Sequence, residues 1–164
     1  MNNEFINKMP YLYTCGIFVK EMRSIFMAKI IYVENCLLDS LQVANLYQSV
    51  GWSNYTIDMT KLIKGINNSS YVISAYDGET LVGLLRVISD ENTIAYVQDI
   101  LVNPNYQRKG IGKKLFSLFL NKYTHVRQIV LICDKEITTE HFYSSIGFKE
   151  ASQFGLACYY FAKS

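Results

Sequence analysis

Histidine is scarce in this chain of 164 residues, and its cysteines lie far apart in the sequence. The sequence holds two histidines, His125 and His141, and four cysteines, none of them in C-x-x-C spacing. Zinc sites draw on such ligands at short, regular spacings, so the sequence predicts no metal centre. We expect the scattered cysteines to stay reduced, several of them as small apolar core residues.

Long apolar runs and a strong charge of one sign are lacking as well. No apolar run approaches the ~20 residues of a membrane-spanning helix. Residues 11–19 are apolar but lack the basic start and the cleavage site of an export signal. The net charge of +2 does not by itself favour nucleic-acid binding. These absences lead us to expect a cytoplasmic protein that binds neither nucleic acid nor a membrane.

What is present is enough apolar material for one domain. Half of the residues are hydrophobic, and 13 tyrosines and 9 phenylalanines are available to line a core or a pocket. We expect residues 1–26 to be an N-terminal extension of unknown role and residues 27–164 to form a single α/β domain.

The apolar and turn patterns predict an alternation of strands and helices. Asp77-Gly78 is typical of a two-residue hairpin turn. A helix capped by Asp39 or Ser40 is expected to end before Gly51, and its predicted inward residues are Leu41, Ala44, Leu46 and Tyr47. A helix between two strands predicts that those strands are parallel. A final hairpin around Gly155 is expected to close the sheet. The predicted strands span residues 29–33, 71–76, 80–89, 93–102, 128–133, 148–153 and 156–162, and the helices span 39–50, 60–66, 111 onward and 136–146.

The most informative stretch is YVQDILVNPNYQRKGIGKKLF, residues 96–116. An apolar strand is stopped by Asn103-Pro104-Asn105, and a basic loop with two glycines then opens an amphipathic helix. Free N–H groups and the dipole at a helix start favour an anion, and glycine lets that anion approach closely. The pattern therefore indicates a phosphate or pyrophosphate cradle.

The sequence matches neither of the two common phosphate-binding motifs. A Walker loop needs glycine where Gln107 stands, and a dinucleotide fingerprint needs glycine where Leu115 stands. On spacing alone, the alternative is a helix that begins with a glycine loop and a solvated basic patch.

Two motifs in this order resemble the GNAT superfamily of N-acetyltransferases. QRKGIG, residues 107–112, matches the family's Gln/Arg-x-x-Gly-x-Gly/Ala loop, and FYSSIGF, residues 142–148, matches its Phe-Tyr-x-x-x-Gly-Phe signature. The resemblance implies a single-domain GNAT fold, with a mixed, mostly antiparallel twisted sheet, a central splayed pair of parallel strands, and flanking helices. It also implies transfer of acetyl from acetyl-CoA to a primary amine, directly within a ternary complex and without a metal.

The resemblance implies where acetyl-CoA binds. Loop amides would hold the CoA pyrophosphate, and the bulged strand before the loop would bind the pantetheine arm. A backbone N–H at that bulge, near Ile100 or Leu101, would bind the thioester oxygen. The expected cofactor-binding residues are Ile100, Leu101, Val102, Gln107, Arg108, Lys109, Gly110, Ile111, Gly112, Lys113 and Phe142.

The catalytic residues follow from the same resemblance. Tyr143 matches the family's general acid, which protonates the leaving thiolate; the alternative is a residue that only packs at a helix end. The general base could be either Asp99 or Asp134, and the alternative is that the amine binds in its neutral form. Asp99 would face away from the site unless a bulge re-aims it. Glu136 stands where many members of the family have asparagine, so that contact to the pantetheine differs here.

Trp52, Tyr55, Tyr96 and Gln98 are the expected acceptor-binding residues, with core packing as the alternative for Trp52. A small-molecule amine is preferred as the acceptor, and the segment LYQSVGW with the aromatic C-terminus loosely resembles arylalkylamine acetyltransferases. A protein lysine or N-terminal acetyltransferase and a catalytically weak acyl-CoA-binding module are the alternatives. A homodimer is compatible with the sequence.

Overall fold

The computed structural model describes residues 30–161. The chain divides into two compact units, Met1–Leu131 and Ile132–Ser164, and each is described by itself. The predicted extension, residues 1–26, lies outside the described residues. Within residues 30–161, no helix is long and apolar enough to cross a bilayer, and no cluster of side chains is suited to hold a metal ion.

The first unit is built on one five-stranded sheet in the order β1-β2-β3-β4-β5. Strands β1 to β4 pair antiparallel, and β4 and β5 pair parallel. The predicted mixed, mostly antiparallel sheet with one parallel pair is confirmed. The strands are β1 Ile31–Glu34, β2 Tyr71–Asp77, β3 Thr80–Ser89, β4 Ile94–Val102 and β5 Gln128–Leu131.

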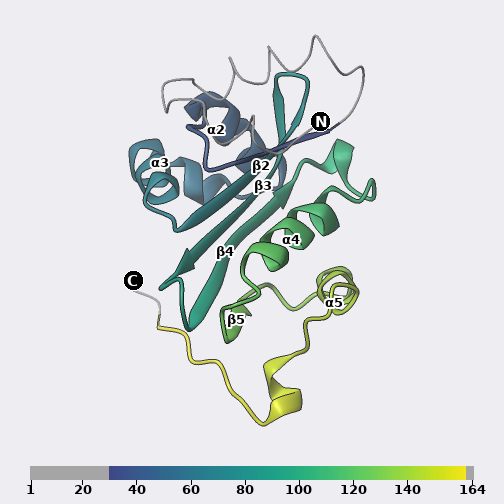
Figure 1. Cartoon of the computed structure of the whole chain (residues 1–164). Coiled ribbons are helices and arrows are strands. Elements are labelled where there is room, and N and C mark those ends of the chain that lie inside the picture. The colour runs from purple at the N-terminus through teal and green to yellow at the C-terminus, as the bar shows by residue number, and fades with distance from the viewer. Residues whose placement is uncertain (1–29, 162–164) are drawn as a thin grey trace, which may run out of the picture. The chain divides into compact units, whose positions relative to one another are not determined.

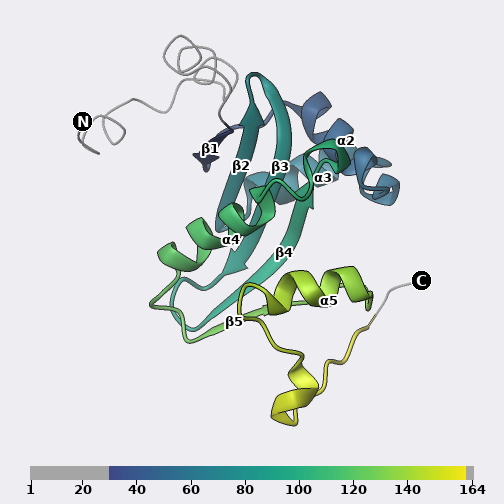
Figure 2. The same cartoon turned by 90° about the vertical axis from the view of Figure 1, so that its right-hand side faces the viewer.

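Helices cover both faces of this sheet (Figures 1 and 2). Helices α2, Ser40–Ser49, and α3, Met59–Asn67, lie on one face, and α4, Ile111–Lys122, lies on the other. A 3-10 turn at Ser53–Thr56 joins α2 to α3, and another at Pro104–Tyr106 joins β4 to the loop before α4. Because both faces are covered, β2 and β3 are buried along nearly their whole length.

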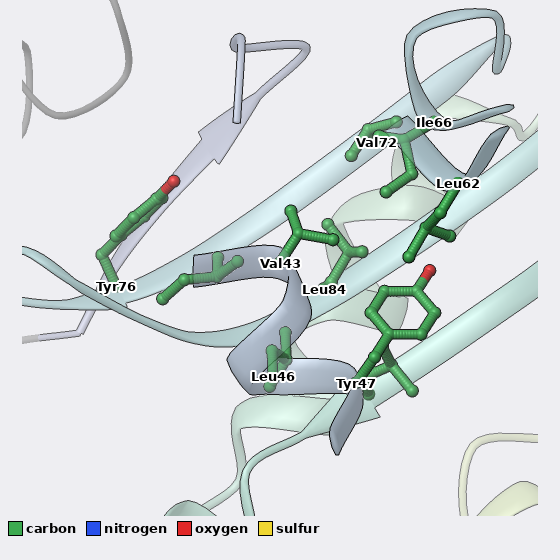
Figure 3. Packing of buried hydrophobic residues seen from close by; sticks show 10 residues of the cluster. Val43, Leu46, Tyr47, Leu62, Ile66, Val72, Tyr76 and Leu84 are labelled. Atoms are coloured by element: carbon green, nitrogen blue, oxygen red, sulfur yellow. The ribbon is translucent and has the colours of Figure 1, made fainter. Parts of the chain in front are cut away.

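The core on the α2 and α3 side is a continuous apolar cluster (Figure 3). Val43 and Leu46 of α2 and Leu62 of α3 pack over Val72 and Leu84 of the sheet. Each of these side chains is at most 7% exposed, which fixes the two helices on the strands.

The local signals for these elements behave as expected, with one exception. The Asp39 carboxylate accepts a hydrogen bond from the Gln42 N–H at 2.9 Å, so the predicted N-cap of α2 is confirmed. The hairpin at Asp77-Gly78 is confirmed too, since β2 and β3 pair up to Asp77 and Thr80. The prediction that Leu41 faces inward is wrong, because its side chain is 68% exposed and Val43 fills the core instead.

The second unit contains helix α5, Ile137–Ser144, and a 3-10 helix at Ala151–Phe154. The helix agrees with the prediction over residues 136–146. The predicted hairpin around Gly155 is wrong: residues 148–150 and 156–161 are not in strands, and Gly155, at φ +69°, caps the 3-10 helix instead. Aromatic residues favour strands only when a partner strand is available, so local preference was insufficient here.

Candidate functional site

The loop between β4 and α4 is held against the ends of β3 and β4 by hydrogen bonds. The Asn103 N–H donates to the Val82 carbonyl at 2.9 Å, and the Gln107 side-chain amide donates to the Val102 carbonyl at 3.0 Å. The Asn103 side chain also accepts from the Asn105 N–H at 3.0 Å. Gln107 therefore positions the loop against the end of β4 through its side chain.

Two left-handed residues turn this loop into the helix. Arg108 has φ +62°, and Gly110, the N-cap of α4, has φ +83° and no side-chain capping bond. The N–H groups of the first turn of a helix have no intrahelical acceptor, and glycine offers no side chain to satisfy them. The start of α4 therefore presents backbone donors at an exposed glycine, which suits an anionic ligand.

Close packing holds the start of α4 on the sheet. Ile111 is 2% exposed, and a Cβ at Gly83 would lie 3.2 Å from Ile111 Cγ2 and 3.3 Å from the Leu101 carbonyl oxygen. Glycine at position 83 thus lets the first residue of α4 rest directly on β3. The donors at the helix start are placed by the core rather than by the exposed loop.

Positive charge surrounds these donors. Arg108, Lys109, Lys113 and Lys114 are exposed, and the Lys109 ammonium lies 4.7 Å from the centre of the Tyr106 ring. The Tyr106 hydroxyl in turn donates to the Asp77 carboxylate at 2.8 Å. The predicted basic loop residues are thus gathered around one helix start.

Strand β4 has an open edge next to this loop. Its parallel pairing with β5 runs only from Ile94 to Val97, whereas its pairing with β3 continues to Val102. In an antiparallel pair, alternate residues direct their N–H and C=O groups away from the partner. Over residues 98–102, such groups have no strand beside them among the described residues. The predicted residues Ile100, Leu101 and Val102 lie in this stretch.

A β-bulge interrupts β4 at the start of its open edge. Val97 lies opposite Val87, but Asp99 lies opposite Arg86, so Gln98 is the extra residue. The predicted bulge exists, but it lies two residues before Ile100. It also re-aims Asp99, which the sequence would otherwise turn away from the face that Tyr96 shares.

Asp99 belongs to a buried hydrogen-bonded network. Its Oδ2 accepts from the Tyr47 hydroxyl at 2.8 Å and from the Arg86 Nε at 2.5 Å, while Oδ1 is buried without a partner. Tyr47, Arg86 and Asp99 are 0%, 8% and 1% exposed. Burial, and then the neighbouring Asp99 charge, raise the pKa of Tyr47 far above its usual value, so the phenol remains a donor.

Three aromatic rings extend this network toward the surface. The Tyr47 ring centre lies 6.2 Å from that of Trp52 and 5.6 Å from that of Tyr55, and the latter two rings stack at 5.5 Å. Tyr55 is 42% exposed and Trp52 is half-buried. The predicted acceptor residues Trp52 and Tyr55 are brought together beside Tyr47; Trp52 also packs on the core cluster, so both of its predicted roles remain open.

The remaining predicted residues lie in the second unit. Tyr143 is half-buried in α5, with its ring centre 5.3 Å from that of Phe142 and 6.0 Å from that of Phe148. Burial raises the pKa of Tyr143 to about 12, and the charge of Cys133 adds to this shift. Asp134, the other candidate base, is exposed.

Sequence reasoning missed both Tyr47 and Arg86 as parts of the site. A signal for the network does exist, because Arg86 is the only charged residue in β3 and Asp99 the only one in β4. Two opposite charges in neighbouring apolar strands predict a buried pair. The partner helix, however, cannot be read from the spacing.

Comparisons with known proteins point to one family. The family described as "Acetyltransferase (GNAT) domain" matches residues 47–155. An uncharacterised ycf52-like N-acetyltransferase of Prochlorococcus marinus is 33% identical over 116 residues, which make up 67% of this chain and 62% of that protein. The chain thus spans less than two thirds of that relative.

Solved structures show the same fold. A GNAT family acetyltransferase of Streptococcus pneumoniae TIGR4 has a TM-score of 0.74 and 30% identity, over 82% of this chain and 98% of that one. An aminoglycoside acetyltransferase from an uncultured soil metagenomic sample, solved with sisomicin, has a TM-score of 0.63 and 24% identity. That match covers 82% of this chain and 97% of the other, and at this identity it supports the fold alone.

Proposed function

Because the chain belongs to the GNAT acetyltransferase family, we propose that it transfers an acetyl group from acetyl-CoA to the primary amine of a small molecule. The start of α4 carries this proposal. Gly110 leaves the first-turn N–H groups uncapped, and the surrounding loop is basic and exposed. These donors suit the CoA pyrophosphate, and the open edge of β4 suits the amide groups of the pantetheine arm.

In the proposed reaction, the amine nitrogen attacks the thioester carbon, the C–S bond breaks, and an amide forms. A backbone N–H at the Gln98 bulge stabilises the thioester oxygen as it becomes negative. Tyr143 donates its hydroxyl proton to the departing thiolate. Its raised pKa, about 12, keeps that proton in place throughout the physiological range.

The amine must lose a proton, and the two candidate bases differ in their surroundings. The Asp99 carboxylate is 1% exposed and its Oδ2 is already bonded to Arg86 and Tyr47, so it is not accessible to the acceptor amine. We therefore give Asp99 a positioning role and leave proton removal to Asp134 or to solvent. Trp52 and Tyr55 form the wall against which the acceptor binds.

A small-molecule acceptor is proposed rather than a protein lysine. The soil aminoglycoside acetyltransferase was solved with the small amine sisomicin, so this fold can accommodate such an acceptor, although the likeness extends to the fold alone. We further propose that the reaction is cytoplasmic, uses no metal, and involves neither nucleic acid nor a membrane. A homodimer is compatible with this proposal.

The test begins with acetyl-CoA binding measured by titration calorimetry. A CoA-release assay then follows with a panel of arylalkylamines, polyamines, amino acids, aminoglycosides and a lysine peptide. We expect binding and turnover with one class of small amine, and turnover at least about tenfold lower for Tyr143→Phe at similar acetyl-CoA affinity. Turnover with the lysine peptide alone would reject the small-molecule acceptor. Binding without turnover would favour an acyl-CoA-binding module.

A further inference from the structure

Tyr47 takes part in two clusters at once. Its ring contacts Trp52 and Tyr55, and its hydroxyl donates to Asp99 at 2.8 Å. Tyr47 comes from α2, and its partner Asp99 lies 52 residues further along the chain in β4. One side chain therefore joins the aromatic wall to the strand that carries the bulge.

Asp99, which accepts the Tyr47 hydrogen bond, lies directly beside the bulge in β4. Asp99 directly follows Gln98, the extra residue of the bulge, and lies opposite Arg86, where the register between β3 and β4 shifts. A bulge interrupts the ladder hydrogen bonds, so the local backbone direction depends on other contacts. At this bulge, those contacts are the bonds from Arg86 and Tyr47 to one carboxylate oxygen.

We propose that Tyr47 and Arg86 are positioning residues that fix the β4 bulge through Asp99, so that its backbone N–H points at the thioester oxygen. Arg86 holds the carboxylate from the neighbouring strand, and its Nη1 would lie 3.5 Å from a Cβ at Gly65 of α3. Tyr47 holds the same carboxylate from α2. Strand β4 is thereby tied to the helical layer at the one point where its own ladder is broken.

The bonds from Tyr47 and Arg86 are the hydrogen bonds that orient the Asp99 carboxylate. Asp99 Oδ1 is buried and has no hydrogen-bond partner, so Oδ2 carries both of the bonds that orient the group. Replacing tyrosine with phenylalanine removes one of the two bonds and keeps the ring that packs edge-on or tilted against Trp52 and Tyr55. The effect of Tyr47→Phe should therefore appear at the bulge rather than in the packing of the wall.

This inference rests on the proposed acetyl-CoA site, and its test needs no known acceptor. The full chain is mixed with acetyl-CoA labelled with ¹³C at the thioester carbonyl, and the carbonyl stretch is recorded by isotope-edited infrared spectroscopy. A hydrogen bond from the bulge lowers this frequency relative to free acetyl-CoA. For Tyr47→Phe we expect the shift to fall by about half or more, while acetyl-CoA affinity changes less than about threefold.

Tyr123→Phe is the matched control. Tyr123 is 1% exposed and its hydroxyl donates to the Glu91 carboxylate at 2.6 Å, away from the bulge. This variant loses the same kind of bond, so a merely structural effect would appear in it equally. We expect its carbonyl frequency to match that of the wild type.

The outcomes separate the two proposals. If the wild type does not bind acetyl-CoA, the proposed function fails, and this inference fails with it. If the wild type binds but Tyr47→Phe keeps the full frequency shift, or Tyr123→Phe loses as much, only the positioning role is overturned. Should Tyr47→Phe not fold, Asp99→Asn tests the same tie, because the amide keeps the size of the group but weakens both bonds.

Discussion

The proposed cofactor loop, residues 103–113, and the buried network of Tyr47, Arg86 and Asp99 both adjoin β4, but they are built from different groups. The loop is exposed, and its glycine N-cap leaves the backbone N–H groups at the start of α4 without a side-chain cap. The network is buried and works through side chains from a helix and two strands. The comparison shows two uses of hydrogen bonds: the loop offers backbone N–H groups to the proposed ligand, whereas side chains of the network bond to one another and anchor β4.

The largest expected effect comes from breaking the network. Arg86→Met leaves the Asp99 carboxylate buried without its cation, and we expect a loss of about 3–5 kcal/mol in the free energy of unfolding. Urea denaturation measures this loss. Lys122→Met is the control, because the pair of Lys122 and Glu34, at 3.3 Å, is nearly half exposed and should contribute less than about 1 kcal/mol. Equal losses in the two variants would mean that the network is no more important than a surface pair.

A smaller effect on stability, but a specific one on binding, is expected at the loop. Gly110→Ala places a Cβ at φ +83°, which costs about 1–2 kcal/mol, although nothing lies within 4 Å of that Cβ. We expect a similar loss of stability for Gly51→Ala, at φ +81° and equally open. Acetyl-CoA affinity should fall about tenfold only for Gly110→Ala, because only that glycine lies at the helix start whose N–H groups would face the ligand. Calorimetric titration of both variants decides this; equal affinities would remove Gly110 from the site.

The same contrast explains how much the sequence could predict. The loop, its glycines and the strand before it lie within one short stretch, so local spacing and family resemblance were enough. The network joins residues 13 and 52 positions apart, and it forms only because a bulge at Gln98 turns Asp99 toward α2. One extra residue in a strand moves the side chains beyond it to the opposite face of the sheet. The local sequence does not predict where such a residue occurs.

The prediction of a C-terminal hairpin failed for a related reason. Residues 156–161 are rich in aromatic side chains, which favour strands, and Gly155 favours a turn. Among the described residues, however, no strand pairs with this segment, and Tyr159 is 95% exposed. Strand formation depends on a partner supplied by tertiary structure, whereas the N-cap at Asp39 depends only on its neighbours and was predicted correctly.

Tyr143 differs from the buried network, because it is a half-buried side chain that a sequence motif did identify. Its pKa is raised by burial from 10.0 to about 12, so folding favours the protonated phenol. The resulting contribution to stability is complete below pH 10.0 and is lost as the pH rises toward about 12.

If Tyr143 is the proton donor, kcat should therefore show no alkaline fall up to about pH 10, where an ordinary phenol would already be half ionised. The pH profile of kcat for the wild type checks this, with Tyr143→Phe as the reference for any other alkaline group. A fall in kcat centred near pH 10 that is absent from Tyr143→Phe would show that burial does not protect the phenol. The motif would then have identified the proton donor correctly, but burial would raise the pKa of Tyr143 by less than the structure implies.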